Sequence, residues 1–166
     1  MLLRLRVKAQ MKKLLHKSEV LEDVCNTVKH EGQVSETQAA RLTEAFGQRF
    51  LKASEAVAEG RVKKYVFQPS GRVVWIVVGK RRDYLVMPAI DYCSCYDFFF
   101  QFDHGHVCYH IIAQKLAEAT GKFDHFEDDD QFYSVLIKEW RAPDQRRPEK
   151  QVSVDEDEGG EKKDTA

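Results

Sequence analysis

Residues 91–120, DYCSCYDFFFQFDHGHVCYHIIAQKLAEAT, hold three of the four cysteines of this chain. These cysteines and one histidine form two tight pairs, Cys93-x-Cys95 and Cys108-x-His110, with twelve residues between the pairs. Thiolate and imidazole are ligands that Zn²⁺ prefers, and a structural zinc takes four ligands in a tetrahedron. The sequence therefore predicts a zinc ion held by Cys93, Cys95, Cys108 and His110.

The spacing gives each pair a way to face one metal ion. Residues i and i+2 of an extended chain point to the same side, so Cys93 and Cys95 can bind from the end of a strand. Successive residues of a helix turn by about 100°, so Cys108 and His110 cannot both face the metal from inside one. We therefore predict a helix that begins near His110, with Cys108 in the turn before it and Gly121 as its C-terminal stop.

Other interpretations of these residues stay open at this point. The cysteines could be ordinary buried residues or a redox pair, although neither explains two close pairs together with a histidine at a helix start. His104 and His106 lie just upstream of Cys108 and could replace His110 as the fourth ligand. We favour His110, because it alone lies on the predicted helix that would fix its ring. The lone Cys25 is predicted to be a small core residue.

The motif resembles the SWIM zinc finger through residues in this order: Cys93, Cys95, Phe98, Cys108 and His110. The further match His110-x-x-Ala113 is similar to the short, stand-alone branch of that family, which includes the zinc-finger subunit of the Shu recombination complex. The resemblance covers residues 71–120, and Tyr96 stands where the family often has proline. It implies Zn²⁺ as the cofactor and Phe98 packed beside the metal.

The resemblance also implies a function. It points to an accessory subunit of DNA repair by homologous recombination that binds a RecA-like recombinase paralogue, with single-stranded or double-stranded DNA as a further ligand. The alternative is a zinc-finger protein that binds nucleic acid directly in transcription or transposition, where SWIM fingers also occur. A zinc with four protein ligands has no open position for a substrate. Because the sequence also lacks a P-loop and a dinucleotide-binding glycine motif, we expect no enzyme.

The insert between the two ligand pairs is too apolar for an ordinary exposed loop. Residues 97–104 contain four phenylalanines: Phe98, Phe99, Phe100 and Phe102. Three consecutive phenylalanines cannot all face one interior, and exposed aromatic patches commonly mark interfaces. We predict that Phe99, Phe100 and Phe102 contact a partner, with burial in the core as the alternative.

A net charge of −1 hides a marked segregation of charge along the chain. Residues 60–82 carry seven basic residues and no acidic one: Arg61, Lys63, Lys64, Arg72, Lys80, Arg81 and Arg82. These residues are the predicted nucleic-acid contacts, and Tyr65, Phe67 and Trp75 could stack on bases if they share a sheet face with the charges. The alternative is a solvated sheet surface, because charges on edge strands also prevent aggregation.

The predicted fold is α+β, a small antiparallel three-stranded sheet with helices and the zinc finger. Residues 1–33 form a basic amphipathic helix, residues 34–140 the main domain, with residues 91–120 as the finger core, and residues 141–166 a disordered acidic tail. A capping box at Ser35 begins a helix that runs to about Ala58. Strands follow at residues 62–67, 73–78 and 84–87, and a last helix at residues 132–140, after the acidic run 127–130.

The cysteines bear on the cellular compartment as well. Because the chain has no recognisable secretory segment, thiols that bind metal indicate a reducing compartment, so we expect an intracellular protein of the cytoplasm, or of the nucleus in a eukaryote. Residues 1–15 are too short and too charged for a signal peptide or a transmembrane helix. We expect no membrane partner.

Overall fold

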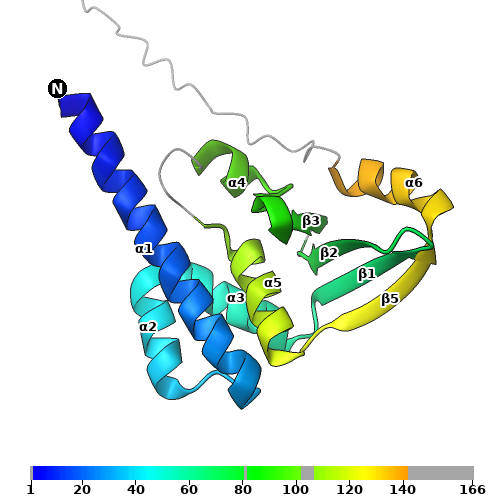
Figure 1. Cartoon of the computed structure of the whole chain (residues 1–166), viewed down its shortest axis with the longest axis horizontal. Coiled ribbons are helices and arrows are strands. Elements are labelled where there is room, and N and C mark those ends of the chain that lie inside the picture. The colour runs from blue at the N-terminus through cyan, green and yellow to red at the C-terminus, as the bar shows by residue number, and fades with distance from the viewer. Residues whose placement is uncertain (1, 81, 102–106, 142–166) are drawn as a thin grey trace, which may run out of the picture.

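The computed structural model describes residues 2–80, 82–101 and 107–141, without the side chains of residues 2–11, 13, 14 and 99–101 (Figure 1). Its helices are α1 (Leu2–Glu31), α2 (Glu36–Phe46), α3 (Gln48–Ala58), η1 (Pro88–Ile90), α4 (Tyr96–Gln101), α5 (Tyr109–Thr120) and α6 (Asp130–Arg141). Its strands are β1 (Val62–Gln68), β2 (Arg72–Val78), β3 (Asp83–Met87), β4 (Tyr92–Cys93) and β5 (Asp124–Asp129). The predicted acidic tail lies outside the described residues, apart from Arg141.

The sheet has five strands in the order β4-β3-β2-β1-β5, so the prediction of three was wrong. The three predicted strands form its centre and pair antiparallel. The two-residue strand β4 continues the antiparallel pattern, whereas β5 pairs in parallel with β1. The acidic run that we assigned to a helix start is largely β5, because an exposed edge strand needs no apolar alternation.

Helices cover both faces of the sheet (Figure 1). Neighbouring residues of a strand point to opposite faces, so each central strand contributes to two cores. On the α5 face, Val62, Trp75 and Val77 pack with apolar residues of α1, α2, α3 and α5. On the α6 face, Phe67, Val74, Ile76 and Leu85 pack against Ile137 and Trp140 of α6.

Two helices occupy the segment that was predicted to be one. The capping box at Ser35 is confirmed, since the Ser35 hydroxyl accepts a hydrogen bond from the Gln38 amide at 3.3 Å and the Gln38 side chain accepts one from the Ser35 amide at 2.8 Å. Gly47 then separates α2 from α3 with a φ of 55°, a left-handed value that glycine adopts without strain. The break lets Leu42 and Phe50 face the same core from differently directed helices.

The N-terminal helix is confirmed as a continuous element of 30 residues. Its C-terminal half packs on the body of the protein through Leu21, Val24 and Val28, while its first turns extend beyond the body (Figure 1). Cys25 is buried there as predicted, and burial raises the pKa of its thiol to about 11. Among the described helices, none is apolar over a length sufficient to cross a bilayer.

Candidate metal centre

The first ligand pair lies at the end of the short edge strand β4, whose last residue is Cys93. Cys93 lies opposite Val86 of β3, and Ser94 extends this pairing by two hydrogen bonds to Leu85. The Ser94 amide donates to the Leu85 carbonyl at 2.9 Å, and the Ser94 hydroxyl accepts from the Leu85 amide at 3.0 Å. Ser94 thereby fastens the segment between the two cysteines to the sheet.

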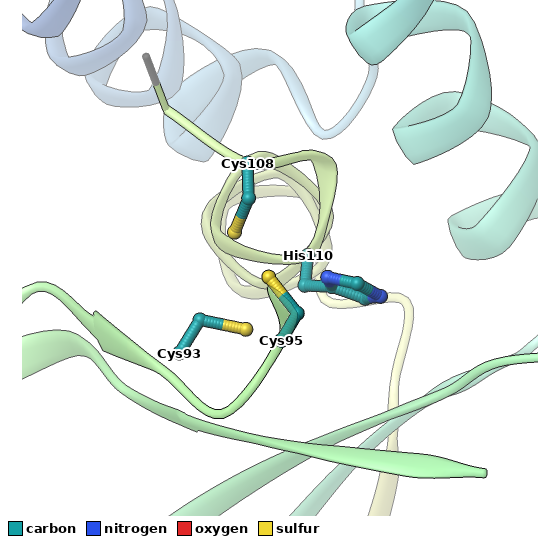
Figure 2. A group of neighbouring side chains, drawn as sticks. All are labelled: Cys93, Cys95, Cys108 and His110. Carbon is teal, nitrogen blue, oxygen red and sulfur yellow. The ribbon is translucent and has the colours of Figure 1, made fainter. Parts of the chain in front are cut away.

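The second pair lies at the start of α5, as predicted. Cys108 is the N-cap residue with an extended backbone, at φ −71° and ψ 156°, and His110 lies in the first turn. The helix ends at Gly121, which has the left-handed φ of 69° expected of a C-terminal stop. Figure 2 shows the sulfur atoms of Cys93, Cys95 and Cys108 directed toward one another, with the His110 ring beside Cys95.

The four predicted ligands form one buried cluster. One ligand atom from each of Cys93, Cys95, Cys108 and His110 lies within 4.8 Å of every other, and each side chain is at most 4% exposed. Ligands of a tetrahedral zinc, at about 2.0–2.3 Å from the metal, lie roughly 3.3–3.8 Å from one another. The residues therefore fit a zinc ion after a small contraction of the cluster.

The imidazole of His110 supports the same conclusion. Both of its nitrogens are buried, and neither has a hydrogen-bond partner among the residues that the structure describes. A buried polar atom without a partner costs about 1–3 kcal/mol, so such atoms are uncommon in folded proteins. Coordination of a metal by one nitrogen removes half of this cost.

The three thiols are close enough to share protons. Hydrogen bonds from Cys108 and Cys93 lower the pKa of Cys95. Hydrogen bonding to Cys108 and Cys95, together with burial, raises the pKa of Cys93. The Phe98 amide also donates to the Cys95 sulfur at 3.3 Å. A divalent cation would allow all three sulfurs to be thiolates, because its charge compensates theirs.

Aromatic side chains surround the ligand cluster. Phe98 packs against the core that contains the cysteines, as the resemblance implied, and its ring centroid lies 5.6 Å from that of Tyr92. The rings of Tyr84 and Tyr109 lie 4.1 Å and 3.8 Å from the His110 ring. These contacts keep the site apolar outside its ligands.

Several of the predicted basic residues contact other residues of the chain. Arg61 is held by Glu59 at 2.6 Å and by the Val78 carbonyl at 3.2 Å. The Arg72 guanidinium lies 4.6 Å from the Tyr133 ring centroid, and Lys80 is exposed. Arg82 donates to the Trp140 carbonyl at 2.9 Å. Three of these arginines therefore make intramolecular contacts, and Arg81 lies outside the described residues.

The two lysines of β1 point to opposite faces of the sheet. The Lys63 ammonium lies 5.7 Å from the Phe126 ring centroid on the α6 face, and that of Lys64 lies 5.5 Å from Trp75 on the α5 face. Phe67 and Trp75 are buried, so they are not available for base stacking. Tyr65 stacks on Phe126 and contacts Trp140 instead. Phe67 and Trp75 are thus core residues, and the condition set for base stacking, an open sheet face shared with the charges, is not met by them.

The predicted partner surface is only partly described. Residues 96–101 form the short helix α4. The structure does not describe the side chains of Phe99 and Phe100, or any part of Phe102, His104 and His106. The interface prediction and the alternative fourth ligands therefore stay predictions.

Sequence reasoning missed the residues that support the ligands. One of these residues is Ser94, and its position between two predicted ligands could have indicated a role in holding them. Tyr84 gave no signal, because it is distant from His110 in the sequence and meets its ring only in the folded protein.

Comparison with known proteins gave two matches. The chain is 32% identical over 108 residues to the zinc finger SWIM domain-containing protein 7 homolog of Dictyostelium discoideum, a match that covers 63% of this chain and 69% of the relative. It is 35% identical over 83 residues to an uncharacterized protein of Archaeoglobus fulgidus, which covers 50% of this chain and 66% of the relative. No family model and no solved structure matches the chain significantly.

Proposed function

Since this chain belongs to the family of SWIM zinc-finger proteins, we propose that it is a zinc-stabilised accessory subunit of DNA repair by homologous recombination. Its proposed partner is a RecA-like recombinase paralogue. The observation that carries the proposal is the buried cluster of four ligands, Cys93, Cys95, Cys108 and His110, in the order of a SWIM finger.

The cluster suits a structural metal ion better than a catalytic one. All four ligand positions of a tetrahedral zinc are supplied by the protein, so no position is open to water or substrate. The metal would join the end of β4 to the start of α5, two segments whose ligands are separated by twelve residues. We therefore assign the zinc to folding and the function to the surfaces that the fold presents.

The proposed partner surface consists of three phenylalanines, two in α4 and one in the insert that follows it. Phe98 of this helix packs toward the core, which leaves Phe99, Phe100 and Phe102 as the residues proposed to contact the recombinase paralogue. The similarity of the ligand motif to the stand-alone branch of the family supports a partner of this class. Aromatic residues are enriched among those that dominate binding energy at interfaces.

Affinity capture of the full chain from its source cells, followed by mass spectrometry, tests this proposal. The wild type should recover a RecA-like paralogue, and Phe99→Ser and Phe100→Ser should each recover less while retaining zinc. Tyr96→Ser is the matched control, because Tyr96 is an exposed aromatic residue of the same helix outside the proposed interface. Recovery of no RecA-like protein by the zinc-loaded wild type would refute the proposed function.

A second candidate function is direct binding of nucleic acid, as in the transcription or transposition alternative. The observation that favours it is the exposed Lys80 and the partly exposed Lys63 and Lys64 in a segment without acidic residues. Binding of single-stranded or double-stranded DNA to the purified chain, with the recombinase partner absent, would support this candidate.

A further inference from the structure

The orientation of His110 requires an explanation, provided that the proposed zinc occupies the site. A zinc-ligating histidine almost always donates its second ring N–H to a carboxylate, a carbonyl or water, and this hydrogen bond fixes the ring. The structure shows no such acceptor for either nitrogen among the residues that it describes. Among the described residues, the contacts that can hold the imidazole in place are those of neighbouring rings.

Two phenol rings make that contact. The Tyr84 centroid lies 4.1 Å from that of His110 and the Tyr109 centroid lies 3.8 Å from it, each ring tilted by 36°. Tyr109 is adjacent to His110 in the chain, so its position follows from the helix start. Tyr84 comes from β3, where it lies opposite Val77 of β2, and it brings an independent part of the fold against the imidazole.

The turn between β2 and β3 is shaped around the Tyr84 ring. The Gly79 amide donates to the Arg82 carbonyl at 2.9 Å, and the Arg82 guanidinium lies 5.5 Å from the Tyr84 centroid. A Cβ atom on Gly79 would lie 2.5 Å from Cε2 of Tyr84 and 2.8 Å from the Arg82 carbonyl oxygen. Any side chain at position 79 would therefore have to displace the tyrosine ring and the Arg82 carbonyl.

We propose that Tyr84 is a positioning residue for the zinc ligand His110, and that Gly79 is required because it leaves space for the Tyr84 ring. The tilted contact between the two rings takes the role of the usual hydrogen bond. It restricts rotation of the imidazole, so that one nitrogen stays directed at the metal. The proposal rests on the proposed zinc site, and it adds to that site a residue from the centre of the sheet.

The test compares Tyr84→Leu with Tyr84→Phe in the zinc-loaded full chain. Loss of a group that orients a metal ligand typically costs 10-fold to 100-fold in metal affinity, so Tyr84→Leu should release zinc to a chelator about 10–100 times faster. Tyr84→Phe keeps the ring and should release zinc at the wild-type rate. Absorption of the cobalt-substituted protein should change for Tyr84→Leu alone, since the spectrum reports ligand geometry.

Gly79→Ala provides a second, independent variant in case Tyr84→Leu fails to fold. It leaves every ring atom present but displaces the ring, so it should also accelerate zinc release. Wild-type release rates in both Tyr84→Leu and Gly79→Ala would overturn the proposal, and fast release from Tyr84→Phe would assign the role to the hydroxyl and overturn it too. If the wild type itself holds no zinc, the proposed function fails first.

Discussion

The strands β1, β2 and β3 contribute side chains to two cores, one on the α5 face of the sheet and one on the α6 face. Of these two cores, the one on the α5 face contains the cysteine ligands. On the α6 face, Phe67, Tyr65, Tyr133 and Trp140 contact one another through their rings. Such a core needs only the exclusion of water from apolar surface. On the α5 face, three thiols and an imidazole are buried among apolar residues, and the imidazole nitrogens lack a hydrogen-bond partner among the described residues unless a metal is coordinated. The two faces should therefore respond differently to loss of the metal.

The largest expected effect is that of zinc removal, and the two tryptophans of the chain can report it separately. Trp75 lies on the α5 face and Trp140 on the α6 face. Structural zinc supplies on the order of 10 kcal/mol in finger peptides, so chelation or Cys95→Ser should disrupt the α5 face first. Fluorescence of Trp140→Phe, which retains Trp75, should change more than that of Trp75→Phe.

Cys25→Ser is the matched control for the loss of Cys95. Both thiols are buried on the α5 face, but Cys25 is not part of the ligand cluster, so this variant should retain one zinc per chain. An equal fluorescence response of both tryptophans to chelation would show that the two faces unfold as one unit. Metal analysis that finds no zinc in wild-type protein purified without chelator would remove the basis of the comparison.

A smaller effect is expected from damage to the α6 face. Replacing a buried aromatic residue by alanine typically costs about 3–5 kcal/mol, so Trp140→Ala should lower the free energy of unfolding by that amount without loss of zinc. Urea unfolding and metal analysis of the same samples measure the two quantities. Val135→Ala, at an exposed position of α6, should change stability by no more than about 0.5 kcal/mol. Loss of zinc from Trp140→Ala would show that metal binding on the α5 face depends on the packing of the α6 face.

The smallest effect concerns Lys63 and Lys64, which lie on the α6 face and the α5 face respectively. If single-stranded DNA binds one face, one of these lysines contacts a phosphate and the other does not. Each contact contributes about −0.7 to the slope of log affinity against log salt, so only one of Lys63→Gln and Lys64→Gln should change the slope, by about that amount. Equal changes in both variants would exclude binding by a single face, and no binding at low salt would exclude direct recognition.

The ligand cluster was predictable because its geometry is local. Two ligands at i and i+2 need only an extended segment, and Cys108-x-His110 needs only a helix that begins between them. Gly121 marked the end of that helix for an equally local reason. Such patterns depend on a few neighbouring residues, so the sequence shows them directly.

The rest of the architecture depends on contacts that the sequence does not display. The strand β5 is acidic and exposed, and its pairing with β1 joins residues as distant as Lys63 and Asp124. The break at Gly47 was missed because Leu42, Phe46, Phe50 and Ala53 continue the apolar pattern of a single helix across it. Tyr84 reaches His110 only because β3 lies beneath α5. These features follow from tertiary packing rather than from local pattern.

The parallel pairing of β5 with β1 has a consequence for the order in which the chain can fold. The other strand pairs join neighbours in the sequence, whereas β5 must return to β1 across the whole of the finger. The entropy lost in closing a loop rises with the length of free chain. We therefore expect β5 to pair with β1 later in folding than the other strands pair. A metal that already joins β4 to α5 leaves only that helix and three residues to be placed before β5. The zinc ion would thus shorten the loop of free chain that must close when β5, the last strand, pairs with β1.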